Sequence, residues 1–305
     1  MKKIVFINIF IFLLLLCFFE LFFVLKNYYS KPIDYKFYDV PINSLYRSIK
    51  GENYTKKPVI LFGCSIAYGY NLDSNQNFSS ILSRETKRPV YNAAVTGYGP
   101  AHMLKLLKEN RMLFNLKDPE YIIYTFIKDH KNRLFYYQGW KYDAHLYFRY
   151  VLDSNGELVP VERKYPFYWR FQIVRQIQYM IEKMNYSNEK VVDKLLFKIF
   201  EESVSVMKKR YPNAKLIMLL YDQKICRDNI EQPIFKTENI LTKLEQEKLT
   251  ELGFEIYNME EIFGKSFCAV DYHSYHPNTE EIDPYHPSTK MWEEFVPKLV
   301  EKLNM

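Results

Sequence analysis

One segment sets the architecture expected of this chain: Pro58-Val59-Ile60-Leu61-Phe62-Gly63-Cys64-Ser65-Ile66-Ala67-Tyr68-Gly69. An apolar, β-branched run ends at Gly63, which is typical of a buried strand followed by a sharp turn. Ser65 then falls at the C-terminal edge of a sheet and near the start of the next helix. Ligands bind at that edge in open α/β sheets, and free helix N–H groups stabilise negative charge there. Ser65 is therefore a candidate nucleophile, and the alternative is a simple helix N-cap.

Strands and helices alternate after this segment, which indicates a parallel sheet covered on both faces. The expected strands are residues 59–62, 90–93, 121–126, 216–221 and 254–257. The expected helices are residues 78–85, 101–114, 189–210, 241–252 and 289–303.

One insertion, residues 131–187, interrupts this alternation and is rich in Tyr, Phe and Trp. A hairpin is expected within it, with strands at 145–152 and 158–161 around a turn at 153–156. Long loops near the ligand edge are often functional, so we interpret the insertion as a lid or substrate wall. The alternative is a structural flap that buries its own aromatic side chains.

Length and composition limit the possible classes. The chain has 305 residues, which suits one large domain or one domain with an insertion. Its net charge of +6 comes from basic and acidic residues that are interspersed, without a basic block, so no nucleic-acid partner is expected. A basic surface favours anionic lipid headgroups or envelope polymers. The 4 cysteines are too few for a disulfide framework, and Cys226 and Cys268 form either a pair or two free thiols.

The N-terminal residues resemble a membrane anchor. Ile4 to Leu25 are apolar except for Asn8 and Glu20, a length sufficient to span a bilayer, and no small-residue cleavage site follows. We expect a single-pass transmembrane helix within residues 1–27 and a linker at 28–56. The lysines at the N-terminus favour an extracytoplasmic location for the remaining domain, residues 57–305.

A second candidate functional stretch lies near the C-terminus: Asp283-Pro284-Tyr285-His286-Pro287-Ser288. We expect a proline-bounded loop here, in which an Asp three residues before a His can bind one imidazole nitrogen and leave the other free to act as a base. A serine hydroxyl is a poor nucleophile unless such a base accepts its proton. Catalysis therefore requires Ser65, His286 and Asp283 to lie together, whereas packing does not.

These segments resemble the SGNH (GDSL-type) hydrolase family over roughly residues 56–305. Gly63-Cys64-Ser65 resembles its first block, with Cys64 in place of the usual aspartate, and the Asp283 to Pro287 stretch resembles its last block. Asn92-Ala93-Ala94-Val95-Thr96-Gly97 resembles the second block. The resemblance implies a flavodoxin-like three-layer α/β/α sandwich with about five parallel strands. It also implies Ser65 as nucleophile, His286 as base and Asp283 as its orienting partner, with backbone N–H groups of Ser65 and Gly97 as oxyanion donors.

The third block departs from the family pattern, which has an asparagine just after the third strand. Here the sequence is Phe126-Ile127-Lys128-Asp129-His130-Lys131-Asn132-Arg133, with Lys128 or Asp129 in that position. Losing one oxyanion donor typically costs about a hundred- to a thousand-fold in rate. Lys128, His130 and Arg133 are candidates to replace it. Asp129 and His130 are alternatively candidates for a second acid–base pair or for substrate binding.

Two other site types compete with this interpretation. The Gly63-x-Ser65-x-Ala67 spacing nearly matches the nucleophile elbow of α/β-hydrolases. In that fold the serine follows several strands, and the acid and the histidine lie on separate loops. In this chain Ser65 follows the first strand of the domain, and Asp283 and His286 share one loop, so the order does not favour that fold. A metal site is the other competitor, because carboxylate and imidazole ligands are dense near the C-terminus. Its residues are Asp271, His273, His276, Asp283 and His286. No established ligand spacing accompanies them, so no metal or other cofactor is expected.

The sequence thus predicts a membrane-anchored serine esterase acting on O-acyl, most plausibly O-acetyl, groups of an envelope carbohydrate or lipid. Two alternatives stay open. An O-acyltransferase would use the same triad with a glycan hydroxyl in place of water. A non-catalytic glycan-binding or assembly protein would keep the fold without the chemistry.

Overall fold

The computed structural model describes residues 54–109, 116, 118–134, 148–161, 189–222, 240–267, 270–275 and 282–305, together with Phe18. Its centre is a 5-stranded sheet with the order β2-β1-β3-β6-β7, in which all neighbouring strands are parallel. The strands are β1 (Val59–Phe62), β2 (Val90–Asn92), β3 (Tyr121–Phe126), β6 (Lys215–Leu220) and β7 (Phe254–Asn258). This is the flavodoxin-like order, in which the chain reverses direction across the sheet beside β1, and ligands bind at that point.

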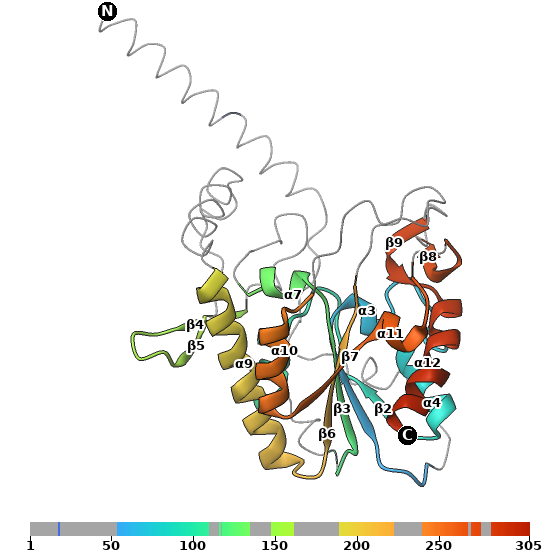
Figure 1. The fold of residues 1–305 in the computed structure, drawn as a ribbon, viewed down its shortest axis with the longest axis horizontal. Coiled ribbons are helices and arrows are strands. Elements are labelled where there is room, and N and C mark those ends of the chain that lie inside the picture. Colours follow the sequence, from blue (N-terminus) through green and yellow to red (C-terminus); the bar gives the residue numbers. More distant parts are fainter. Residues whose placement is uncertain are drawn as a thin grey trace, which may run out of the picture.

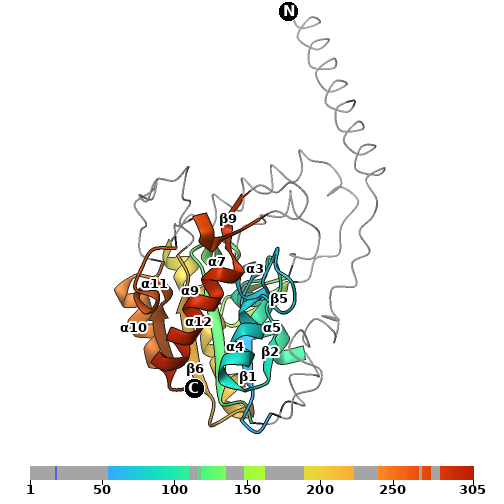
Figure 2. The same cartoon turned by 90° about the vertical axis from the view of Figure 1, so that its right-hand side faces the viewer.

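Helices cover both faces of the sheet, as Figures 1 and 2 show. One layer contains α5 (Pro100–Glu109), α9 (Glu189–Arg210) and α10 (Lys243–Leu252). The other contains α4 (Phe78–Thr86), α11 (Met259–Phe263) and α12 (Thr289–Leu303). The three-layer α/β/α sandwich predicted from the sequence is therefore confirmed.

The burial of the strands explains why continuous apolar runs in the sequence predicted them. In β1, Ile60 and Phe62 face the layer of α5 and α9, whereas Val59 and Leu61 face the layer of α4 and α12. All six residues of β3 are buried. Strands buried on both faces need apolar residues at every position, and this requirement produces uninterrupted hydrophobic runs.

Most expected boundaries agree with the structure to within two residues. The segments at 59–62, 121–126, 189–210 and 289–303 match their predicted limits. Helix α5 ends at Glu109, and residues 110–114 of that expected helix lie outside the described ranges.

Five short elements of the described residues were not predicted: α7 (Asp129–Asn132), α11, the 3-10 helix η4 (Val270–Tyr272), β8 (His273–Tyr275) and β9 (Ile282–Pro287). The expected proline-bounded loop at 283–288 is wrong, because these residues up to Pro287 form β9. Among the described residues, strand β9 pairs with β8 in an antiparallel 2-stranded ribbon. Prolines are tolerated there because edge strands have backbone N–H positions that need no partner.

The structure describes residues 131–134 of the aromatic insertion, at the end of α7, and residues 148–161, which form a hairpin of β4 (Arg149–Leu152) and β5 (Leu158–Val161). Phe148 and Tyr150 are buried in the same cluster as α5 and α9. The Lys105 ammonium lies 4.1 Å from the centre of the Phe148 ring. These aromatics therefore pack into the core, as a structural flap would. The rest of the expected lid, residues 135–147 and 162–187, lies outside the described ranges.

Within the described ranges, no helix combines the length and the apolar character that crossing a bilayer requires. The expected anchor at residues 1–27 lies outside those ranges except for Phe18, and the expected linker lies outside them up to residue 53.

Gly63 allows β1 to end directly beside β3. Its φ is +152°, a conformation that other residues rarely adopt, and a Cβ built at this position would lie 2.0 Å from the Thr125 hydroxyl oxygen. Any side chain here would push β1 away from β3 at the point where Ser65 leaves the sheet.

Replacing Gly63 with alanine should lower the free energy of unfolding by roughly 2–4 kcal/mol, because overpacking adds to backbone strain. Gly264→Ala is the matched control, since Gly264 also has a positive φ, +74°, but a Cβ added there would meet no atom within 4 Å. It should cost only about 1–2 kcal/mol. Denaturant unfolding of the purified chain measures both values. Equal losses for the two variants would contradict the role given to close packing against Thr125.

Candidate active site

The nucleophile candidate stands at the first position of a short helix. Helix α3 (Ser65–Tyr68) follows β1 after a two-residue turn, and its N-cap residue is Cys64, whose side chain makes no capping hydrogen bond. The alternative that Ser65 serves only as an N-cap is therefore wrong. Ser65 is 7 % exposed, and its hydroxyl is directed to the histidine of the last block.

Three side chains from two distant parts of the sequence form a continuous hydrogen-bonded chain. Ser65 Oγ lies 2.8 Å from His286 Nε2, and His286 Nδ1 lies 2.7 Å from Asp283 Oδ2. An ionised carboxylate only accepts hydrogen bonds, so Nδ1 carries the proton and Nε2 is left to accept one from the serine. This is the arrangement in which a histidine can act as a general base toward a hydroxyl.

Asp283 is held by two further donors. The Asn71 amide donates to Asp283 Oδ2 at 2.9 Å, and the backbone N–H of Tyr285 donates to Oδ1 at 3.0 Å. Asn71 has a φ of +64°, which asparagine tolerates better than most residues. The Tyr70 ring contacts the His286 ring, with centroids 4.9 Å apart. The segment after α3 therefore orients both the acid and the base.

A buried asparagine fixes the turn that carries the nucleophile. The Asn92 amide, at the end of β2, donates to the Ala67 carbonyl of α3 at 2.9 Å and to the Ser79 hydroxyl of α4 at 3.2 Å. Its own carbonyl accepts from Ala94 N–H at 3.0 Å. The sequence motif contained Asn92, and the structure shows that it joins α3, α4 and the loop leading to Gly97.

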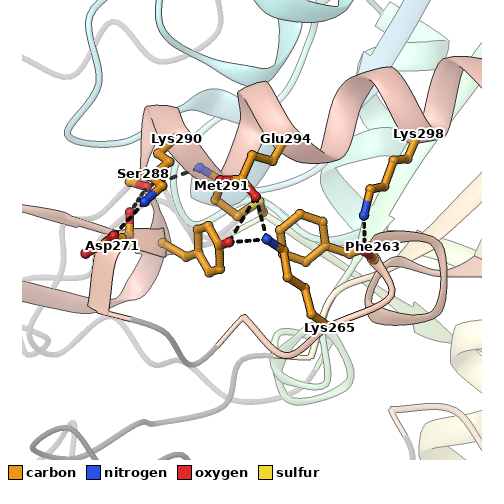
Figure 3. A network of polar contacts seen from close by, with 9 residues as sticks. Phe263, Lys265, Asp271, Ser288, Lys290, Met291, Glu294 and Lys298 are labelled. Carbon is orange, nitrogen blue, oxygen red and sulfur yellow. Dashed lines mark hydrogen bonds and ion pairs between the residues drawn. The ribbon is translucent and has the colours of Figure 1, made fainter.

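The turn that leads into β8 is attached to the start of α12 by a network of polar contacts (Figure 3). Ser288 caps α12 at Met291 N–H, and its hydroxyl donates to the Asp271 carbonyl at 2.6 Å. Lys290 pairs with the Asp271 carboxylate at 2.5 Å, and Lys265 pairs with Glu294 at 2.5 Å. These contacts surround the residues that follow His286, so they fix the ribbon relative to the sandwich.

The loop with Gly97 runs beside the nucleophile turn. Val95 N–H donates to the Gly63 carbonyl at 3.3 Å, and Tyr98 N–H donates to the Val95 carbonyl at 3.0 Å. The second bond closes a four-residue turn with Gly97 at its third position, where a φ of +81° favours glycine. The structure thus places the predicted oxyanion loop next to the end of β1.

The third-block candidates are dispersed by α7. Lys128 is exposed at the N-terminus of α7, and Asp129 accepts a hydrogen bond from Arg133 Nε at 2.7 Å. His130 is 0 % exposed and lies against the rings of Tyr124 and Phe126. The prediction that His130 binds substrate does not fit this buried position. The alternative acid–base pair with Asp129 does not fit it either, because that carboxylate is directed to Arg133.

Burial also decides the charge of His130. Its Nδ1 lies 3.1 Å from the Tyr124 hydroxyl and accepts from Ile127 N–H at 3.4 Å. Burial first, and then the charges of Arg133 and His102, lower the pKa of His130 well below its usual range. His130 is therefore a neutral core residue.

The competing metal site is only partly within the described chain. His276 lies outside it, and among the described residues no group of three or more His, Cys, Asp or Glu side chains could hold a metal ion. His273 is buried, and its burial lowers its pKa, an effect that the nearby Asp283 partly offsets. Cys64 is a buried free thiol, whereas Cys226 and Cys268 lie outside the described ranges.

Sequence reasoning did not identify Asn71 or Tyr70 as part of the site. The only available signal was that both follow the nucleophile motif within six residues. Their contacts depend on where the distant ribbon lies, which local patterns do not encode.

No protein-family model and no curated protein matches the sequence. Among solved structures, similar folds occur in a carbohydrate esterase family 2 enzyme from Corynascus thermopiles (Myceliophthora fergusii), with 11 % identity, a TM-score of 0.44 and coverage of 84 % of this chain and 68 % of that one. The acetyl xylan esterase Est2A from Butyrivibrio proteoclasticus is 11 % identical, with a TM-score of 0.45 and coverage of 83 % of this chain and 64 % of that one. The psychrotrophic esterase EstA from Pseudoalteromonas sp. is 13 % identical, with a TM-score of 0.42 and coverage of 82 % of this chain and 100 % of that one. All three are esterases by name, but similarity at this level does not decide the activity of this chain.

Removing the Asn71 amide should lower kcat about tenfold, because one hydrogen bond to a charged group is worth about 1.5 kcal/mol or more. Asn71→Gly is the appropriate variant, since glycine retains the positive φ at no steric cost. Lys87→Gly is the matched control, because Lys87 has a similar φ of +56° at the end of α4. Ester-hydrolysis kinetics of both variants give the comparison. A kcat for Asn71→Gly equal to that of Lys87→Gly would show that the amide does not orient Asp283.

Proposed function

We propose that this chain is a serine ester hydrolase of the SGNH type, with Ser65 as nucleophile, His286 as general base and Asp283 as the residue that orients it. The observation that carries this proposal is the hydrogen-bonded chain from Ser65 Oγ through both His286 nitrogens to Asp283. Ser65 and His286 are 221 positions apart in the sequence. Packing alone does not require their polar atoms to meet at the ligand edge of the sheet.

The proposed reaction has two stages. Ser65 Oγ attacks the acyl carbonyl and transfers its proton to His286 Nε2, while the carbonyl oxygen gains negative charge near the N–H groups of Ser65 and Gly97. His286 then gives this proton to the departing alcohol, leaving an acyl group on Ser65. A water molecule releases the acyl group by the same steps in reverse order, again with His286 as base.

We further propose that the substrate is an O-acyl, most plausibly O-acetyl, group on an envelope carbohydrate or lipid. The support comes from sequence features: an apolar segment at residues 4–25 long enough to anchor the chain, a net charge of +6 and an aromatic-rich insertion after the third strand. On this proposal the domain lies on the extracytoplasmic side of a membrane. A glycan hydroxyl replacing water in the second stage would make the same site an acyltransferase.

A fluorophosphonate probe should modify Ser65, and Ser65→Ala should lower kcat/KM for p-nitrophenyl acetate about a thousandfold or more, because nucleophile and base act as one unit. Peptide mass spectrometry locates the probe, and a spectrophotometric assay measures turnover. His286→Ala should cause a similar loss. Ser266→Ala, a substitution of an exposed serine elsewhere on the surface, is the control and should retain full turnover.

The result that contradicts the proposal is unchanged turnover in Ser65→Ala or labelling of another residue. Glycan binding without ester cleavage, and unaffected by His286→Ala, would instead support the non-catalytic alternative. Recovery of the acyl group on an added sugar rather than as free acid would identify the transferase.

A further inference from the structure

Arg133 connects the segment after β3 to the proposed oxyanion loop. Its Nη1 donates to the Tyr98 carbonyl at 2.7 Å, and its Nε donates to the Asp129 carboxylate at 2.7 Å. Asp129 lies one helical turn earlier on α7, so it holds the guanidinium from behind. The Arg133 side chain is 16 % exposed, which makes this a largely desolvated pair.

The carbonyl that Arg133 binds belongs to Tyr98, the residue whose N–H closes the turn containing Gly97. That turn begins at Val95, whose N–H is bound to the Gly63 carbonyl, and ends at Tyr98. The Arg133 side chain also packs against Gly99, where a Cβ would lie 3.4 Å from Arg133 Cβ. The Gly97 N–H therefore sits between two fixed points, the end of β1 on one side and the Arg133 guanidinium on the other.

The charge of Arg133 also reaches the nucleophile turn. Burial alone would lower the pKa of Arg133, but interactions with Cys64 and with Asp129 outweigh it and raise the pKa. Cys64 immediately precedes Ser65. A guanidinium that stays charged binds the Tyr98 carbonyl more strongly than a neutral donor would, because charge-assisted hydrogen bonds are stronger than neutral ones.

We propose that Arg133 is a positioning residue that fixes the oxyanion turn through the Tyr98 carbonyl, in place of the asparagine that this chain lacks after its third strand. The inference rests on the proposed esterase function. It gives the α7 segment a specific role, which is to hold the backbone turn that carries the Gly97 N–H. Asp129 acts with it by orienting the guanidinium.

The alternative is that Arg133 and Asp129 form an ordinary structural ion pair with no effect on the site. The chain offers a matched control for this alternative. Arg88 has the same two kinds of partner, with Nη1 bound to the Glu120 carboxylate at 2.6 Å and to the Lys57 carbonyl at 3.0 Å. It is also buried. Lys57 and Glu120 precede β1 and β3, so this arginine lies at the opposite edge of the sheet from Ser65.

The experiment compares Arg133→Met, Arg133→Lys and Arg88→Met in the full chain, using kcat and KM for p-nitrophenyl acetate together with thermal unfolding. Arg133→Met should lower kcat about 10- to 100-fold with KM changed less than about threefold, because a misplaced donor acts mainly on the transition state. Arg133→Lys should recover part of the loss by retaining the charge. Arg88→Met should lower the midpoint of unfolding and leave kcat of the folded protein unchanged.

A kcat for Arg133→Met within about twofold of the wild type overturns the proposal, as does an equal kcat loss in Arg88→Met. If Arg133→Met fails to fold, Arg133→Lys decides: kcat equal to that of the wild type, with unchanged stability, also overturns it. Failure of the esterase function itself would be recognised separately, because Ser65→Ala would then retain the turnover of the wild type.

Discussion

The hydrogen bond between Ser65 and His286 is the interaction on which the site depends, and it imposes a demanding constraint on the fold. The serine is fixed by the turn between β1 and α3, whereas the histidine belongs to a ribbon outside the main sheet. Neither element alone determines the distance between them. The ribbon must be held from both sides, by Asn71 near the nucleophile and by the contacts at the start of α12.

Several features of the chain follow from that constraint. Gly63 lets β1 approach β3 closely, and Asn92 ties the nucleophile turn to α4. The Cys64 thiol between Gly63 and Ser65 is buried in the apolar cluster that also contains Ile66 and Ala67 of α3. In each case a buried contact fixes the backbone near Ser65. The proposed reaction is assigned to three side chains, those of Ser65, His286 and Asp283.

The sandwich was predictable because strands buried on both faces and long amphipathic helices leave strong periodic signals. Strand β3 and helices α9 and α12 matched their expected limits for this reason. The contact among Ser65, Asp283 and His286 was predictable because an Asp three residues before a His, with a serine after the first strand, is the pattern of a base that serves a nucleophile. The strand β9 was missed because its prolines indicate a loop, and nothing local shows that an edge position makes them acceptable. The burial of His130 was missed because a four-residue helix after β3 decides which side chains face the core.

A crystal structure of the protein after reaction with a monoethylphosphonate-type inhibitor is the most direct test of the proposed site. We predict phosphorus bonded to Ser65 Oγ, with one phosphoryl oxygen about 2.7–3.1 Å from the backbone nitrogens of both Ser65 and Gly97. His286 should remain within hydrogen-bonding distance of the ester oxygen that Ser65 contributes. A phosphoryl oxygen directed away from Gly97, or an adduct on a residue other than Ser65, would contradict this prediction.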